Sequence, residues 1–281
     1  MSLIKIKSNA KINLSLNVLG KLNSGFHKIE SIISFIDLHD VIQIKQISSK
    51  THQVIFYGKF SKVIPKNNTV TNLLMKLDDE NLLKNKKYLV KINKKIPLKS
   101  GMGGGSMNAA SILKYFIEKK KIKIKKYKIN KIINQIGSDV ILGMKKKNSI
   151  LKGNGELYRS NVKLNLHLLI IKPNFGCSTK MIYAKHKGFS KSLFNKSNKI
   201  DRQDLLKVSN NDLERAAFNK YPILRRIKSY LQNLDNIYFA NMTGSGSTII
   251  GYFLTKNAAI KAQKKLKNKY KNYWCIYSKT I

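Results

Sequence analysis

The spacing of apolar and polar residues divides the chain into predicted strands and helices. Near the N-terminus apolar residues alternate with polar ones, which is the period of a strand with one buried face. These alternating positions are Ile4, Ile6, Ile12, Leu14, Leu16 and Val18. Three further strands are predicted over residues 41–44, 53–57 and 88–92. Over residues 69–83 the leucines recur at helical spacing instead, which predicts a helix.

The same rules predict mixed helices and strands in the rest of the chain. Helices are expected after a glycine-rich stretch at 101–105 and over residues 129–135, 212–217, 223–231 and 258–266. Strands are expected over residues 166–171, 249–254 and 273–277. Because both kinds of element alternate throughout, the pattern predicts an α/β or α+β protein with two sub-domains.

The composition narrows the class of protein. With 281 residues the chain can bury a real core in one large domain or two modest ones. No apolar run approaches the roughly 18 residues of a membrane helix, so we expect a soluble protein. Cys177 and Cys275 are the only cysteines, too few for a disulfide framework and without a CxxC pair. We therefore expect a cytoplasmic location.

The charge is strongly positive, with 55 Lys and Arg against 14 Asp and Glu and a formal net charge of +41. Taken alone, this excess indicates a nucleic-acid-binding protein, which is the alternative from a different functional class. The excess is nearly all Lys, which is spread along the chain among many Asn and Ile. Lys, Asn and Ile all have A/T-rich codons, so a drift in base composition explains their abundance without a binding role. The densest run, residues 119–126, could bind RNA or simply connect two helices in solvent, and we favour the second interpretation.

The stretch IPLKSGMGGGSMNAA at residues 96–110 places four glycines within five positions. A strand, a glycine-rich turn and a helix in this order form an anion site, because bare backbone N–H groups converge at the helix N-terminus. A Walker A loop would end in Gly-Lys-Ser/Thr, and a dinucleotide fingerprint would have glycine at Ser106; neither pattern is present. A simple turn needs fewer glycines, so the stretch predicts phosphate binding.

The glycine stretch resembles the phosphate loop of the GHMP kinases (galactose, homoserine, mevalonate and phosphomevalonate kinases). Residues 10–14, AKINL, are similar to the first motif of that family, and residues 242–247, MTGSGS, to its third. The triple glycine is similar to the branch that acts on a cytidine-diphosphate methylerythritol. Four shorter stretches also match this branch, at residues 25–27, 137–140, 153–156 and 211–214.

The resemblance implies an α+β fold, the two-domain α/β-type GHMP kinase fold. It has an N-terminal nucleotide domain like domain 2 of ribosomal protein S5 and a C-terminal ferredoxin-like domain. We expect an ATP-binding kinase domain over residues 1–155 and a C-terminal GHMP kinase domain over residues 156–281, with the active site in the cleft between them.

The implied reaction is ATP-dependent phosphorylation of the 2-hydroxyl of 4-diphosphocytidyl-2-C-methyl-D-erythritol, a step of non-mevalonate isoprenoid synthesis. ATP and Mg²⁺ are the implied cofactors. The expected partner is this small molecule, with no membrane or specific nucleic acid, and the protein is expected to be a monomer or homodimer. Another alcohol, mevalonate or homoserine, is the alternative within the family, and a degenerate inactive relative is a further one.

Asp139 is the best candidate for the base that takes up the hydroxyl proton. It precedes Val140, Ile141 and Leu142, so we expect it to be partly buried, where carboxylates usually have a role. The alternative is a helix cap. The resemblance favours the base and implies that Lys11 pairs with it, because a cation there would keep Asp139 ionised and stabilise the developing alkoxide.

The resemblance also implies the binding residues. The nucleotide would be bound by the glycine-rich stretch, by the third motif and by two positions near adenine: Pro97, Gly101, Gly103, Gly104, Gly105, Ser106, Thr243, Gly244, Asn68 and Lys95. The acceptor's cytosine would be held by Phe26, His27 and Tyr183, and its hydroxyl groups by Asn13. The chain departs from the branch at Met107, where a second Ser is usual, which affects the expected metal shell. The Mg²⁺ ligands are not identified by the sequence.

Overall fold

The computed structural model of the chain describes all residues except 1–2, 24, 63, 154–155, 160–163 and 195–207. The chain forms two compact units. The first consists of Met1–Ala10, Leu38–Leu98 and Gly103–Lys146, and the second of Lys11–Asp37, Lys99–Met102 and Lys147–Ile281. Strands β1 (Ile4–Asn13) and β3 (His27–Ile47) pair with each other and contribute residues to both units. The predicted boundary between residues 155 and 156 stays a prediction.

The sheet of the first unit contains a βαβ crossover. Strand β5 (Lys87–Asn93) lies between β4 (Gln53–Tyr57), to which it is parallel, and the C-terminal part of β3, to which it is antiparallel. Helix α1 (Thr69–Asp79) lies between β4 and β5 in sequence, since parallel strands need a long connection. The register pairs Ile42 with Ile92 and Ile44 with Val90.

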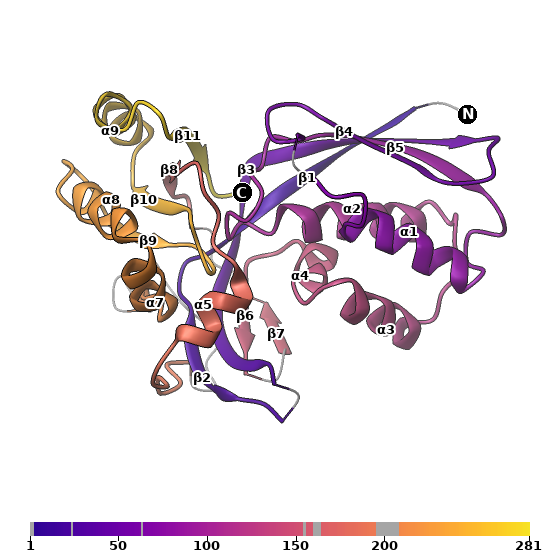
Figure 1. Cartoon of the computed structure of the whole chain (residues 1–281), viewed down its shortest axis with the longest axis horizontal. Coiled ribbons are helices and arrows are strands. Elements are labelled where there is room, and N and C mark those ends of the chain that lie inside the picture. The colour runs from indigo at the N-terminus through magenta and orange to yellow at the C-terminus, as the bar shows by residue number, and fades with distance from the viewer. Residues whose placement is uncertain (1–2, 24, 63, 154–155, 160–163, 195–207) are drawn as a thin grey trace. The chain divides into compact units, whose positions relative to one another are not determined.

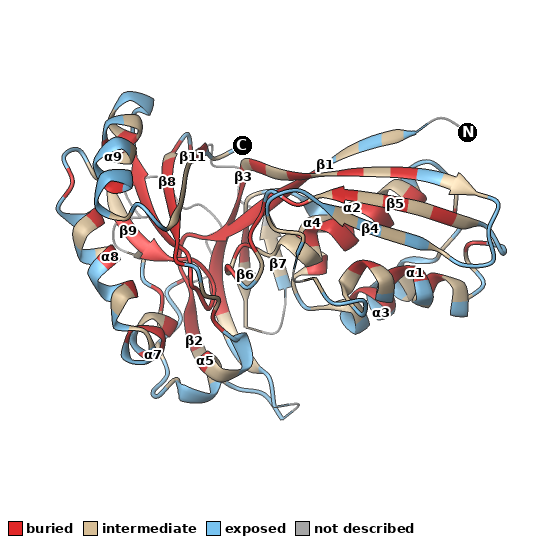
Figure 2. Cartoon of the chain, turned by 45° about the horizontal axis from the view of Figure 1, so that its top comes forward, coloured by how far each residue is buried: buried red, intermediate tan, exposed pale blue. Residues whose placement is uncertain are grey.

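Helices cover one face of this sheet. They are α1, α2 (Gly104–Glu118), α3 (Lys126–Ile136) and α4 (Val140–Lys145), and in Figure 1 the first three lie along the same side of β4 and β5. Buried and more exposed positions alternate along β5, as Figure 2 shows. The buried positions pack with apolar residues of α1, α2 and α3 into one core. This core fixes the strand and the helix that flank the glycine-rich stretch.

The N-terminal part of β3 belongs to the second unit. There β2 (Asn17–Lys21) and β6 (Ser149–Lys152) pair with it in antiparallel fashion, and β7 (Glu156–Arg159) pairs with β6. Residues 30–36 of β3 are all buried. A strand covered on both faces does not alternate apolar and polar residues, so the periodicity predicted only residues 41–44 of these 21 residues.

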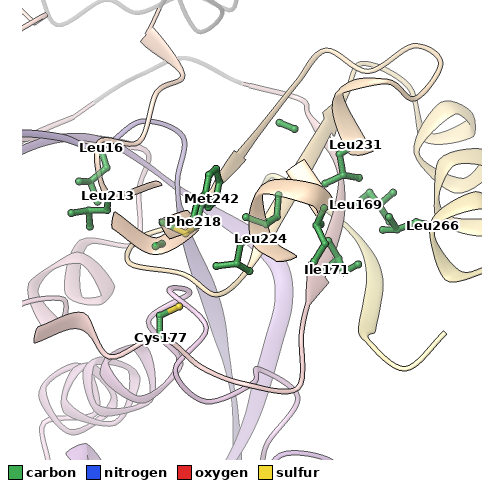
Figure 3. Close-up of a cluster of buried hydrophobic side chains, with 14 of the residues drawn as sticks. Leu16, Leu169, Ile171, Cys177, Leu213, Phe218, Leu224, Leu231, Met242 and Leu266 are labelled. Carbon is green, nitrogen blue, oxygen red and sulfur yellow. The ribbon is translucent and has the colours of Figure 1, made fainter. Parts of the chain in front are cut away.

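A second, antiparallel sheet completes this unit. Its order is β11 (Trp274–Lys279), β8 (His167–Lys172), β10 (Ile249–Phe253) and β9 (Phe239–Met242). The helices of the same region are α5 (Thr179–Lys185), α7 (Leu213–Lys220), α8 (Pro222–Gln232) and α9 (Lys256–Lys269). Leu224 and Leu231 of α8 and Leu266 of α9 share one buried cluster with Leu169 and Ile171 of β8 (Figure 3).

The structure confirms the predicted α+β class and most predicted elements. The helix predicted over residues 69–83 ends earlier, at Asp79, because Asn81, Lys84 and Asn85 adopt positive φ and turn the chain back toward β5. The strands β6, β7 and β9 and the helices α4 and α5 were not predicted; each spans only four to seven residues, too few to establish a period. In the described part of the chain, no helix is both long and apolar enough to cross a membrane.

Candidate active site

The glycine-rich stretch connects β5 to α2 as predicted. Gly101 and Gly103 have φ values of 75° and 66°, the left-handed region that favours glycine. The first hydrogen bond within α2 runs from Met107 N to Gly103 O at 2.9 Å. The N–H groups of Gly104, Gly105 and Ser106 precede it and point out of the helix end, which is the arrangement that binds phosphate oxygens.

The third motif forms a second glycine turn, which packs against the first. Gly246 N donates to Thr243 O at 3.0 Å, and Gly244 has a φ of 56°. A Cβ at Gly101 would overlap the carbonyl oxygen of Thr243, and a Cβ at Gly244 would lie 3.0 Å from Gly101 O. The backbone at Gly101 therefore contacts the backbone at Thr243 and Gly244 directly. Only glycine permits this contact at positions 101 and 244, because any other residue would place a Cβ between the two segments. The structure brings together the predicted residues Gly101, Thr243 and Gly244.

The first motif is hydrogen-bonded to both glycine turns. Lys11 N donates to Met102 O at 3.2 Å, and Asn13 N donates to the Thr243 hydroxyl at 2.9 Å. The Lys11 side chain is only 5% exposed, and its ammonium donates to Asn13 Oδ1 at 2.7 Å. Asn13 Nδ2 donates in turn to Ser31 Oγ at 2.8 Å. Lys11 and Asn13 thus lie beside the second turn, and the predicted contact of Asn13 with the acceptor stays a prediction.

The stretch at residues 211–214 holds the second glycine turn in place, a role that the sequence did not reveal. Asn211 Nδ2 donates to Met242 O at 2.6 Å and to Gly244 O at 2.8 Å. Glu214 Oε1 accepts from Met242 N at 2.8 Å, and its other oxygen pairs with Lys228 at 2.5 Å. Burial raises the pKa of Glu214, while Lys228 acts in the opposite direction. The buried Asn211 and the partly buried Glu214 therefore fix the backbone on either side of Thr243.

The predicted cytosine-binding residues lie at a hairpin and a helix of the second unit. Phe26 ends the turn between β2 and β3, where Leu22 N donates to its carbonyl at 2.7 Å, and it is 70% exposed. The ring centroids of His27 and Tyr183, on α5, are 4.8 Å apart with a tilt of 37°. Desolvation, followed by the charges of Lys21 and His186, lowers the pKa of His27. These effects favour the neutral imidazole, which has one nitrogen to donate and one to accept a hydrogen bond.

Asp139 lies at the N-cap of α4 and is half-buried, as predicted from its apolar neighbours. Its side chain makes no capping hydrogen bond, so the helix-cap alternative does not describe what the carboxylate does. Within the same unit, the Ser106 hydroxyl lies 3.6 Å from the point that a Cβ at Gly137 would occupy. The residues before Asp139 thus approach the start of α2, while its role as base stays a prediction.

The two residues predicted near adenine have local structural roles. Asn68 is the N-cap of α1, where its Oδ1 accepts from Val70 N and Thr71 N and its Nδ2 donates to two carbonyls. Lys95 is exposed, and its N–H donates to Asp40 at 2.8 Å. Pro97 is buried. The nucleotide contacts of these residues stay predictions.

A buried ionic network lies under the glycine-rich stretch and was missed in the sequence. Asp40, fully buried, accepts from the Lys94 ammonium, from Ile96 N at 2.9 Å and from Asn108 Nδ2 at 3.0 Å. Lys94 is 2% exposed, and a Cβ at Gly104 would lie 3.3 Å from its nitrogen. One sequence feature could have revealed it. Asp40 lies two residues before Ile42 and four before Ile44, so its side chain points to the same buried face of the strand.

Met107 does not point toward the free N–H groups at the start of α2. It is 2% exposed, and its sulfur lies 3.1 Å from the point that a Cβ at Gly143 of α4 would occupy. The side chain therefore packs between α2 and α4 as part of the core. Its departure from the usual Ser leaves the backbone groups of residues 104–106 unaltered.

Comparison with known proteins identifies the family. The model for the GHMP kinases N terminal domain matches residues 68–146, and the model for GHMP kinases C terminal matches residues 192–272. The chain is 56% identical over 282 residues to the 4-diphosphocytidyl-2-C-methyl-D-erythritol kinase of Pelagibacter ubique (strain HTCC1062), with 100% of each chain covered.

Solved structures of two kinases share the fold. A crystal structure of 4-(cytidine 5'-diphospho)-2C-methyl-D-erythritol kinase aligns with a TM-score of 0.77 and 20% identity, covering 98% of this chain and 99% of the other. Homoserine kinase from Cytophaga hutchinsonii aligns with a TM-score of 0.72 and 17% identity, covering 100% and 95%. At these identities the likeness concerns the fold alone. The assignment to a family rests on the full-length identity of 56% to the kinase of Pelagibacter ubique. The chain therefore belongs to the GHMP kinases, in the branch named for 4-diphosphocytidyl-2-C-methyl-D-erythritol.

Proposed function

We propose that the protein transfers the γ-phosphoryl group of ATP to the 2-hydroxyl of 4-diphosphocytidyl-2-C-methyl-D-erythritol. The observation that supports this most directly is the backbone contact between Gly101 and the Thr243–Gly244 turn, to which Lys11 and Asn13 are hydrogen-bonded. Within the second unit, Gly101, the second glycine turn, a buried ammonium and a buried amide thus lie close together. Backbone N–H groups without side chains in front of them and a fixed positive charge suit the transfer of a phosphoryl group.

ATP fits the chemistry of the glycine-rich stretch. The N–H groups at the start of α2 suit the oxygens of a triphosphate. Among the described residues, no group of three or more His, Cys, Asp or Glu could form a metal site. Mg²⁺ in phosphoryl-transfer enzymes takes most of its ligands from phosphate and water, so we propose that it binds with ATP and neutralises phosphate charge. We assign no protein ligand to it.

Asp139 would take the proton of the acceptor hydroxyl as that oxygen bonds to the γ-phosphorus. The bond from the γ-phosphorus to the β–γ bridging oxygen breaks, and ADP leaves with the electron pair. The ammonium of Lys11 would stabilise the negative charge that develops on the attacking oxygen. Lys11 is nearly fully buried, and a charge withdrawn from water interacts more strongly with its partner.

The acceptor's cytosine would bind at Phe26, His27 and Tyr183. A phenyl ring that is 70% exposed offers a face for stacking, and the neutral imidazole of His27 can both donate and accept. Asn13 would contact the hydroxyl groups through the remaining donor of its amide. Mevalonate and homoserine have no aromatic ring and would leave Phe26 without a partner.

The direct test is the release of ADP by the purified protein with Mg²⁺-ATP. Four reactions are compared: the cytidyl acceptor, mevalonate, homoserine and no acceptor. We expect release only with the cytidyl compound. Release of ADP with another alcohol would support a kinase activity but contradict the proposed acceptor. No release with any of the acceptors would contradict the proposed activity.

Replacement of Phe26 by Ala is expected to raise the KM for the cytidyl acceptor about tenfold, since stacking on an aromatic ring is worth about 1–3 kcal/mol per base. The kcat and the KM for ATP should stay unchanged, because Phe26 would touch only the base. The unfolding temperature should also be retained, since the ring is 70% exposed. Tyr127→Ala, at an equally exposed aromatic residue of α3, is the matched control. An acceptor KM unchanged in Phe26→Ala would rule out the stack.

A further inference from the structure

A pocket of about 270 Å³ lies beside the second glycine turn, entirely within the second unit. Seven residues line it: Lys99, Gly101, Cys177, Ser178, Thr179, Ser245 and Gly246. Ligand pockets for a whole small molecule usually measure about 300–1,000 Å³, so this one suits one group of a larger ligand.

The lining of this pocket suits an anion. Ser178, Thr179 and Ser245 contribute hydroxyl groups, and those of Thr179 and Ser245 lie 3.0 Å apart. None of the lining residues is acidic. Burial raises the pKa of Cys177 to about 11, so its thiol contributes no negative charge at neutral pH. Lys99 supplies the single positive charge of the lining.

Lys99 has a backbone conformation that does not favour lysine. Its φ is +47°, in the left-handed region that glycine and asparagine adopt most readily. The neighbouring chain is shaped around it, since a Cβ at Gly176 would lie 2.9 Å from Lys99 O and overlap the Lys99 Cβ. The turn by itself would be satisfied by glycine. Lys99 is exposed, and lysine adds a positively charged side chain to the lining of the pocket.

We propose that this pocket binds a phosphate group and that Lys99 is its charged ligand-binding residue. The proposal rests on the proposed function, which supplies two sources of such a group: the diphosphate of the cytidyl acceptor and the triphosphate of ATP. Hydroxyl and ammonium donors around a small space match the oxygens of either. Lys99 would then contribute to substrate selection in addition to the residues assigned from the family motifs.

The test uses Lys99→Asn, which removes the charge while keeping a side chain that tolerates positive φ. Lys120→Asn is the matched control, because Lys120 is an exposed lysine with a φ of +51° that does not line the pocket. Isothermal titration calorimetry measures the Kd of the full-length protein for ATP, for the cytidyl acceptor and for inorganic pyrophosphate. Thermal unfolding of each variant shows that the fold is kept, and Lys99→Gly serves if Lys99→Asn unfolds.

We expect Lys99→Asn to weaken binding of pyrophosphate and of one of the two substrates about tenfold, as for the loss of a charged hydrogen bond. A change for the acceptor assigns the pocket to its diphosphate, and a change for ATP assigns it to the triphosphate. Kd values within twofold of wild type for all three ligands, or an equal loss in Lys120→Asn, would overturn the proposal. Because binding is measured without turnover, the ATP and pyrophosphate titrations test the pocket even if the cytidyl acceptor proves not to be phosphorylated.

Discussion

Replacement of Asp139 by Asn is expected to lower kcat by at least about a hundredfold, the usual effect of losing a general base. Asn has nearly the same size and is as good an N-cap as Asp, so α4 should be retained. The carboxylate makes no capping hydrogen bond in the structure, so α4 does not depend on it for a side-chain cap. Steady-state release of ADP with the cytidyl acceptor measures the effect.

Two further measurements separate a catalytic role of Asp139 from a structural one. The Kd for ATP and the unfolding temperature of Asp139→Asn should equal those of the wild type. Asp79→Asn removes the same charge from an exposed position of α1 in the same unit and should keep full turnover. Near-wild-type kcat in Asp139→Asn would exclude Asp139 from the proton transfer.

Replacement of Asp40 by Asn is expected to lower the free energy of unfolding by about 3–5 kcal/mol, because it leaves the ammonium of Lys94 buried without an opposite charge. Asp40 is fully buried, Lys94 is 2% exposed, and Asp40 also accepts from two backbone N–H groups before the glycine-rich stretch. The Asn side chain has the same shape but directs N–H groups at donors. Urea-induced unfolding measures the change.

The paired control is an exposed ion pair of the same kind. Lys265 and Asp235 lie 2.7 Å apart with side chains 56% and 76% exposed, so Asp235→Asn should leave the urea midpoint unchanged. Addition of Lys94→Met to Asp40→Asn removes the stranded charge and should recover much of the lost stability. A midpoint for Asp40→Asn equal to that of the wild type would show that the network does not stabilise the fold.

The fold could be predicted from sequence where one face of an element is solvated. Strand β5 and helices α2, α3 and α8 expose one side to water, so their apolar residues recur at a period that reveals the element. The first part of β3 is buried on both faces and shows no such period. The short elements β6, β7 and β9 span four residues each, too few for their apolar residues to establish a period.

The candidate site could be predicted where it depends on backbone chemistry. Glycines at 101 and 103–105 and at 244 and 246 are needed because side chains would strain or block the turns there, so the requirement is visible in the sequence as an excess of glycine. The pairing of the first and third motifs was available only through the resemblance to a family. Asn13 and Thr243 are 230 residues apart, and nothing in either segment alone indicates that they bond.

By itself, the sequence determined the α+β class, the glycine-rich turn between a strand and a helix, and the family, because each depends on local spacing or on an ordered set of motifs. Tertiary structure alone revealed the network of Asp40 and Lys94, the support of the second glycine turn by Asn211, and the pocket at Lys99. Each of these joins side chains to partners far along the chain. A lysine, aspartate or asparagine looks the same in the sequence whether it lies on a solvated surface or in a buried network. Only the burial of the residue and the position of its partner distinguish these two cases.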